Sequence, residues 1–158
     1  MRALIVFFSF DGNTKFIAET VAKTMNADMI ELKTSKQYPT EGFRKYLWGG
    51  KSVIFGDEPK LINGDIDLNG YETIIIGTPV WAGSYTPPVK SLIARSKIQG
   101  KRIALFASHG GGGAEKCFAK LKQALPGNEF IGEIAFAEPK KNPEDSSEKA
   151  VRWASELK

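Results

Sequence analysis

Short apolar runs alternate along this chain with segments whose apolar residues recur on one helical face. The strongest runs lie at residues 4–8, 73–76, 102–107 and 130–136, and a weaker one lies at 27–32. The first three are unbroken, which is typical of strands buried on both faces of a parallel sheet. Helical patterns follow Thr14, Pro87, Ala114 and Pro143. The sequence therefore predicts an α/β fold, a doubly wound parallel sheet with helices on both faces.

A chain of 158 residues matches the size of one domain, which we expect to span residues 1–158. Apolar residues make up 42% and charged residues 25%, a composition that excludes a disordered or fibrous protein. The single cysteine, Cys117, and the single histidine, His109, exclude a disulfide framework and a His-rich or zinc-cluster metal site. The connection at 33–70 is long for one crossover, and we expect a short helix at 41–47 within it.

The charge balance is mildly basic, with 22 Lys and Arg against 18 Asp and Glu, a net charge of +4. These basic residues form no dense cluster, so we expect no nucleic-acid partner. A solvated basic face explains the excess more simply than an acidic partner does. The apolar run at residues 3–8 is too short for a signal peptide, and no run reaches the ~18 residues of a membrane span. We therefore expect a cytoplasmic protein without a membrane span.

Three loops of unusual composition follow three of the expected strands. The carboxyl ends of parallel strands meet at one edge of an open α/β sheet, which is where ligands bind. The first loop is Ser9, Phe10, Asp11, Gly12, Asn13 and Thr14; the second is Thr78, Pro79, Val80, Trp81, Ala82 and Gly83; the third is Ser108, His109, Gly110, Gly111, Gly112 and Gly113. Together the three loops predict a site for a ligand with one phosphate and one flat aromatic group.

Each loop also has a purely structural interpretation. Hydroxyls and backbone N–H groups of the first loop can bind phosphate at a helix N-terminus, but Asn13 or Thr14 would equally serve as an ordinary N-cap. In the second loop, Trp81 either stacks on a flat ring or belongs to the core. In the third loop, glycines let the backbone approach a ligand, and His109 either tunes that ligand or is simply exposed.

The combination closely resembles the flavodoxin family, whose cofactor is flavin mononucleotide (FMN), over nearly the whole chain. The family's phosphate loop reads Ser/Thr-x-Thr-Gly-x-Thr, which Ser9, Gly12 and Thr14 match, while Asp11 replaces the middle threonine. A carboxylate there is unfavourable for a phosphate unless it points away or meets a cation. The resemblance implies five strands in the order 2-1-3-4-5 and a phosphate at the first loop. It also implies that the second loop wraps the isoalloxazine ring, with Trp81 against one face, and that the third holds the pyrimidine edge.

The third loop departs from the family pattern. Many flavodoxins place a Tyr there on the second face of the ring, and this chain has none. His109, a peptide plane, or an aromatic residue of the long connection, Tyr46 or Trp48, is a candidate for that position. The resemblance further implies that the peptide between Ala82 and Gly83 turns over when the flavin is reduced.

The function implied by the resemblance is noncovalent FMN binding for electron transfer between redox partner proteins, a reductase and an electron acceptor, without a catalytic residue. An alternative on the same fold is an FMN-dependent NAD(P)H:quinone-type oxidoreductase, which needs an open face over the flavin. A further alternative is a module that has lost its flavin and serves only in protein contacts. The sequence leaves the oligomeric state open.

Three other motifs fail in their sequence context. Residues 50–52 resemble the end of a Walker A loop, but Lys45 stands where the earlier glycine is required. Residues 106–110 resemble a nucleophile elbow, but a phenylalanine replaces its first glycine and no later histidine follows. A phosphorylatable receiver domain would need an aspartate where this chain has Gly77 and Thr78.

Overall fold

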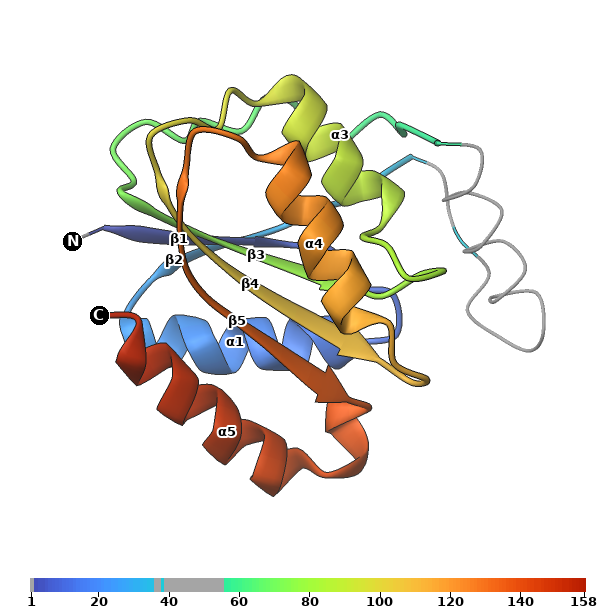
Figure 1. Ribbon diagram of the computed structural model, residues 1–158, viewed down its shortest axis with the longest axis vertical. Coiled ribbons are helices and arrows are strands. Elements are labelled where there is room, and N and C mark those ends of the chain that lie inside the picture. Colours follow the sequence, from blue (N-terminus) through green and yellow to red (C-terminus); the bar gives the residue numbers. More distant parts are fainter. Residues whose placement is uncertain (1, 36–37, 39–55) are drawn as a thin grey trace.

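The computed structural model describes residues 2–35, 38 and 56–158, which contain a five-stranded parallel sheet (Figure 1). Its strands are β1 (Ala3–Phe7), β2 (Asp28–Glu31), β3 (Thr73–Pro79), β4 (Arg102–His109) and β5 (Glu129–Ala137). Their order, β2-β1-β3-β4-β5, confirms the predicted order. The expected helix at 41–47, the aromatic candidates Tyr46 and Trp48, and residues 45 and 50–52 lie outside the described residues.

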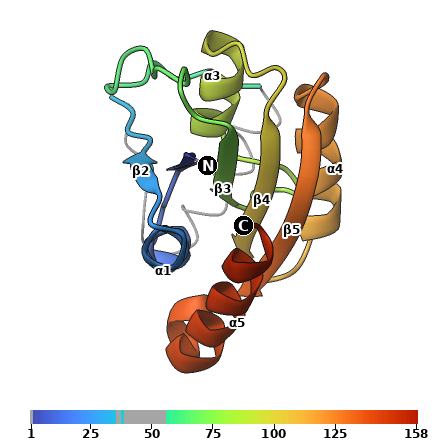
Figure 2. The ribbon, with the colours of Figure 1, turned by 90° about the vertical axis from the view of Figure 1, so that its left-hand side faces the viewer.

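Helices cover both faces of the sheet, as Figures 1 and 2 show. They are α1 (Asn13–Met25), α3 (Pro87–Arg95), α4 (Ala114–Ala124) and α5 (Pro143–Glu156), with a short 3-10 helix, η1 (Pro139–Lys141). α1 and α5 pack on one face through Ile17 and Trp153, and α3 and α4 pack on the other through Leu92 and Leu121. None of the helices in the described part of the chain has the length and apolar character that crossing a membrane requires.

The burial of each strand explains the strength of its sequence signal. β1 and β3 are buried at every position, and alternate residues serve opposite faces: Ile74 and Ile76 pack with α3 and α4, while Ile75 packs with α1 and α5. β2 and β5 form the two edges of the sheet and are only partly buried. Edge strands need fewer apolar residues, so the runs at 27–32 and 130–136 are weaker or interrupted.

Gly77 in β3 lies directly against the ring of Phe106 in β4. A Cβ on Gly77 would stand 2.1 Å from Cζ of Phe106, a distance that no real contact allows. Phe106 itself is fully buried and packs edge-on against Trp153 of α5, with ring centroids 6.4 Å apart. The glycine at position 77 is therefore required for the packing of α5 on the sheet.

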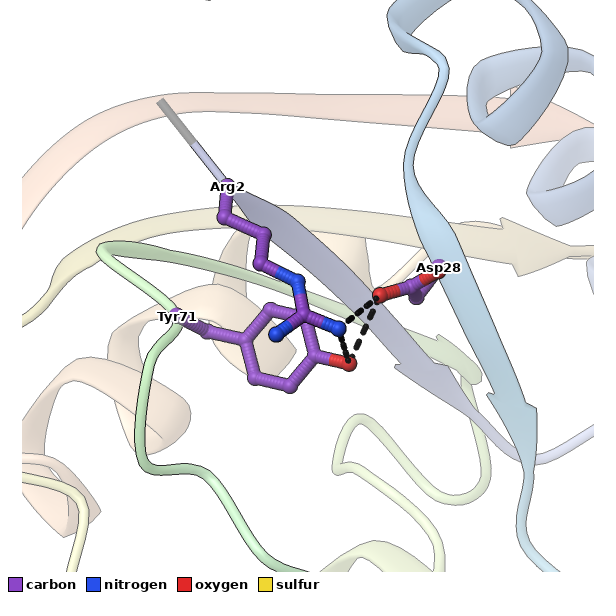
Figure 3. A network of polar contacts seen from close by, with 3 residues as sticks. All are labelled: Arg2, Asp28 and Tyr71. Carbon is purple, nitrogen blue, oxygen red and sulfur yellow. Dashed lines mark hydrogen bonds and ion pairs between the residues drawn. The ribbon is translucent and has the colours of Figure 1, made fainter.

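A polar network ties three neighbouring strands together at their amino ends, opposite the three loops (Figure 3). Arg2 precedes β1, Asp28 begins β2 and Tyr71 precedes β3. The Tyr71 hydroxyl donates to Asp28 Oδ2 at 2.7 Å, and the Arg2 guanidinium donates to the same oxygen at 3.1 Å. The guanidinium also lies 4.6 Å from the centre of the Tyr71 ring. The hydrogen bond from Tyr71, helped by Arg2, holds the pKa of Asp28 below its usual value.

Candidate functional site

The three loops predicted from the sequence lie together at the carboxyl edge of the sheet. Thr14 Oγ1 and Ser108 Oγ are 2.7 Å apart and join the first loop to the third. The Val80 N–H donates to the Ser108 carbonyl at 2.9 Å and joins the second loop to the third. The rings of Phe10 and Trp81 meet edge-on, with centroids 5.3 Å apart, and join the first loop to the second. The fold thus gathers all three loops into one region; the ligand-binding role of their residues stays a prediction.

The first loop starts α1 in a way that the sequence analysis did not foresee. The N-cap is Gly12, in the left-handed conformation with φ 91°, so the expected capping role of Asn13 or Thr14 is wrong. Asn13 and Thr14 lie inside the first turn, because the helix begins directly after Gly12. Ser9 contributes instead, since its Oγ accepts the backbone N–H of Lys15 at 3.1 Å. The Ser9 hydroxyl therefore lies against the first turn of α1, at the carboxyl end of β1.

The carboxylate of Asp11 turns toward its own loop. Its two oxygens accept the backbone N–H and the side-chain amide of Asn13, at 3.1 Å and 3.0 Å. The amide oxygen of Asn13 in turn accepts the backbone N–H of Lys140 in η1, at 3.0 Å. Lys140 Nζ donates to the Asp11 carbonyl at 3.1 Å and stands 3.0 Å from where a Cβ on Gly12 would be. A cation that the sequence analysis did not select thus lies on the first loop.

The second loop ends in a tight two-residue turn. Trp81 and Ser84 exchange two backbone hydrogen bonds of 2.9 Å. The residues between them, Ala82 and Gly83, have φ of 50° and 69°, the left-handed pair of a type I′ turn. The central peptide of this turn is the Ala82–Gly83 peptide that the family resemblance singles out.

Thr78 supports the second loop from inside. Its hydroxyl accepts the Thr86 N–H at 3.1 Å, donates to the Pro79 carbonyl at 2.8 Å, and is fully buried. The hydroxyls of Thr78 and Thr86 are also 3.2 Å apart. Thr78 and Thr86 therefore clamp the start and the end of the loop that carries Trp81.

Trp81 is half-buried in a cluster of four aromatic side chains. The rings of Phe8, Phe10 and Tyr38 each meet the Trp81 ring edge-on. Their centroids lie 5.9 Å, 5.3 Å and 5.1 Å from the Trp81 centroid. Burial raises the pKa of the Tyr38 hydroxyl to about 12, with a smaller contribution from the charge of Asp57. Neighbours fix the Trp81 ring while part of it remains accessible, and its stacking on a flat ligand ring stays a prediction. Among the described residues of the long connection, Tyr38, just beyond β2, contacts Trp81.

The third loop is open at its tip and tightly packed at its end. His109 Nδ1 accepts the N–H of Gly112 at 3.0 Å, which folds the loop back on itself. A Cβ added at any of residues 110–112 would meet no atom of residues 2–35, 38 or 56–158 within 4 Å. At Gly113, in contrast, a Cβ would stand 3.3 Å from the Gly83 Cα and from the Val80 side chain. The second and third loops therefore touch through glycine backbone and leave open space beside it.

A family model described as Flavodoxin matches residues 2–142. The chain belongs to the flavodoxin family. No curated protein matches it significantly.

Solved flavodoxin-like structures share the fold at low sequence identity. A flavoprotein from Lactobacillus acidophilus NCFM, crystallised in complex with FMN, has 24% identity and a TM-score of 0.74, covering 90% of this chain and 97% of that one. A WrbA-like flavodoxin protein from Agrobacterium tumefaciens has 19% identity and a TM-score of 0.66, with coverage of 99% and 96%. Oxidised Flavodoxin 2 from Bacillus cereus has 18% identity and a TM-score of 0.61, with coverage of 99% and 97%. At these identities the likeness supports the fold.

Two further lysines of the chain come close to the loops. Lys15 in α1 forms an ion pair with Glu31 at 3.1 Å, beside the end of β2. Lys116 in α4 lays its side chain over the second loop, with Cδ 3.1 Å from where a Cβ on Gly83 would be. Neither was selected from the sequence, where isolated lysines carry no signal. Their positions follow from helices that begin at the same edge of the sheet.

Proposed function

We propose that this chain binds FMN at the junction of the three loops and carries electrons between redox partner proteins. One observation carries the proposal: all three predicted loops meet at one sheet edge. The hydroxyl pair of Thr14 and Ser108 joins the first loop to the third, and the contact of Gly113 with Gly83 joins the third loop to the second. Family membership supports the same cofactor. When bound, FMN would supply one- and two-electron redox chemistry to the site.

The residues at the junction fit such a ligand. The Ser9 hydroxyl and the Lys140 ammonium, which lie at the N-terminus of α1, offer donors suited to a phosphate. Trp81 offers an aromatic surface for a flat ring, held by its neighbours. The open space beside residues 110–112 leaves room for backbone N–H and carbonyl groups to reach the polar edge of that ring. In this proposal the chain binds, orients and partly shields the flavin.

A binding titration tests the proposal. We expect the apoprotein to quench FMN fluorescence with one site per chain. Trp81→Ala should weaken binding about tenfold or more, because stacking of a flat ring on an aromatic side chain contributes about 1–3 kcal/mol. Val151→Ala, on the outer side of α5, is the matched control and should bind as the parent does. A parent protein that neither quenches FMN nor gives a calorimetric signal would contradict FMN binding.

A second candidate function is supported by the open third loop. This loop carries no Phe, Tyr or Trp, and no atom of the described residues lies within 4 Å of a Cβ added at residues 110–112. Such an opening would admit a nicotinamide or a quinone, as an FMN-dependent NAD(P)H:quinone-type oxidoreductase requires. Steady-state NAD(P)H oxidation by the FMN-loaded protein with a quinone separates the candidates. Rapid turnover without a partner protein supports the oxidoreductase, and its absence supports the carrier.

A further inference from the structure

We propose that Lys140 is a cationic ligand for the phosphate of FMN, so that the site selects the phosphorylated flavin by charge. This inference rests on the proposed function and adds to it a specificity-determining residue from outside the three loops. Lys140 comes from η1, which follows β5 and lies more than 120 residues beyond the first loop.

Three contacts fix Lys140 over the first loop. The Glu138 N–H donates to the His109 carbonyl at 2.9 Å, which turns the chain at the end of β5 toward the site. The backbone N–H of Lys140 donates to the side chain of Asn13 at 3.0 Å. Its ammonium then reaches the Asp11 carbonyl at 3.1 Å. The hydrogen bond from the Lys140 backbone to Asn13 does not involve the ammonium. The ammonium can therefore leave the Asp11 carbonyl for a phosphate oxygen while η1 stays in place.

The ammonium has spare capacity for an anion. Within the described residues, no ion pair involves Lys140, whereas the neighbouring Lys141 pairs with Glu138 at 2.7 Å. An ammonium carries three donors, and the Asp11 carbonyl takes one of them. A phosphate monoester carries a charge of about −1.5 to −2 at neutral pH. Hydrogen bonds between such charged groups are roughly twice as strong as those between neutral ones.

Lys140 also explains how the first loop tolerates Asp11. A carboxylate at this position opposes a nearby phosphate, and both of its oxygens already accept hydrogen bonds from Asn13. The Lys140 ammonium donates to the backbone carbonyl of Asp11. Its positive charge there offsets the negative charge of the Asp11 carboxylate. The loop and η1 thus form one unit, in which Asn13 links the Asp11 carboxylate to the backbone of Lys140.

The experiment compares FMN with riboflavin, which lacks the phosphate, by fluorescence quenching. We expect Lys140→Ala to weaken FMN binding about tenfold or more, since a hydrogen bond to a charged group contributes about 1.5–3 kcal/mol. Riboflavin binding should not change, and Lys140→Arg should retain most of the FMN affinity. Lys141→Ala is the matched control, because its ammonium pairs with Glu138, and it should bind FMN as the parent does.

Salt dependence provides a second measurement that does not require riboflavin to bind tightly. The FMN affinity of the parent should fall more steeply between low and moderate salt than that of Lys140→Ala. Equal slopes, or a loss that is the same for both flavins, would overturn the role of Lys140. A parent protein that binds no FMN would overturn the proposed function instead. A parent and a Lys140→Ala variant that bind FMN equally well would refute only this inference.

Discussion

Thr14 in α1 and Ser108 at the end of β4 meet hydroxyl to hydroxyl at 2.7 Å, although 94 residues separate them. Both side chains are buried. A single pair of oxygens therefore joins the start of the first helix to the third loop, and with it two of the three parts of the candidate site.

Removing both hydroxyls of this pair should destabilise the protein by less than the sum of the two single removals. Ser108→Ala leaves the Thr14 hydroxyl buried without its partner, and we expect the free energy of unfolding to fall by about 1–3 kcal/mol. Thr14→Val should behave similarly. The double variant should lose clearly less than the sum of the two single losses, by about 1 kcal/mol. Urea unfolding of the four proteins measures the cycle, and strict additivity would contradict a direct link.

Asp11→Asn should strengthen FMN binding. The amide keeps an oxygen that can accept the Asn13 N–H, while the negative charge beside the expected phosphate disappears. Because an exposed charge interaction contributes about 0.2–1 kcal/mol, we expect roughly a two- to fivefold gain in affinity. Riboflavin affinity should stay the same. A weaker FMN complex would indicate that the carboxylate supports the loop more than it repels the ligand.

Gly113→Ala should disturb the contact between the second and third loops. The residue has φ 86°, and a Cβ there would press on the Gly83 backbone and the Val80 side chain at 3.3 Å. We expect a loss of about 1–3 kcal/mol in unfolding free energy. Gly111→Ala is the matched control in the same loop, since a Cβ there meets nothing within 4 Å. Equal losses for both variants would argue against the packing role of Gly113.

Ala82 holds a backbone conformation that suits other residues better. With φ 50° at the first central position of a type I′ turn, Asn is preferred and a β-branched residue is strongly disfavoured. We expect Ala82→Asn to raise the unfolding free energy by about 0.5 kcal/mol. Ala82→Val should lower it by about 1–2 kcal/mol. Thermal unfolding of the ligand-free protein shows the two opposite signs, and a stabilising valine would contradict the turn assignment.

Tyr71→Phe should raise the pKa of Asp28 toward its ordinary value. The lost hydrogen bond is the main cause of the lowered pKa in the folded protein. A lowered carboxyl pKa stabilises the folded state above the ordinary pKa of about 3.9, and this contribution disappears as the pH falls below it. The stability difference between parent and variant should therefore shrink in acid. An NMR titration of the Asp28 carboxyl gives the shift directly, and an unchanged pKa would assign the effect to Arg2.

The central strands were predictable because helices bury both of their faces. The strand at 73–76 could be predicted from its own residues, since every residue of β3 is apolar or small enough to be buried. The three loops were predictable for a related reason, as each follows a strand that the apolar runs had already located.

Lys140 and Tyr38 could not be selected from composition alone. Each follows an edge strand, β5 or β2, whose sequence signal is weak, and each reaches the site through tertiary placement. A rule that applied the carboxyl-end argument to all five strands, rather than to three, would have included both. The capping role of Asn13 or Thr14 was mispredicted because Gly12 takes a left-handed conformation that no side-chain preference reveals.

The bonds of the first loop exist in the protein alone: Ser9 to Lys15, Asp11 to Asn13, and Asn13 to Lys140. If the first loop binds the phosphate as proposed, the anion would meet a segment that is already ordered, so that little further ordering entropy would be lost on binding. Association at this end of the site should then be limited by encounter rather than by rearrangement of the chain.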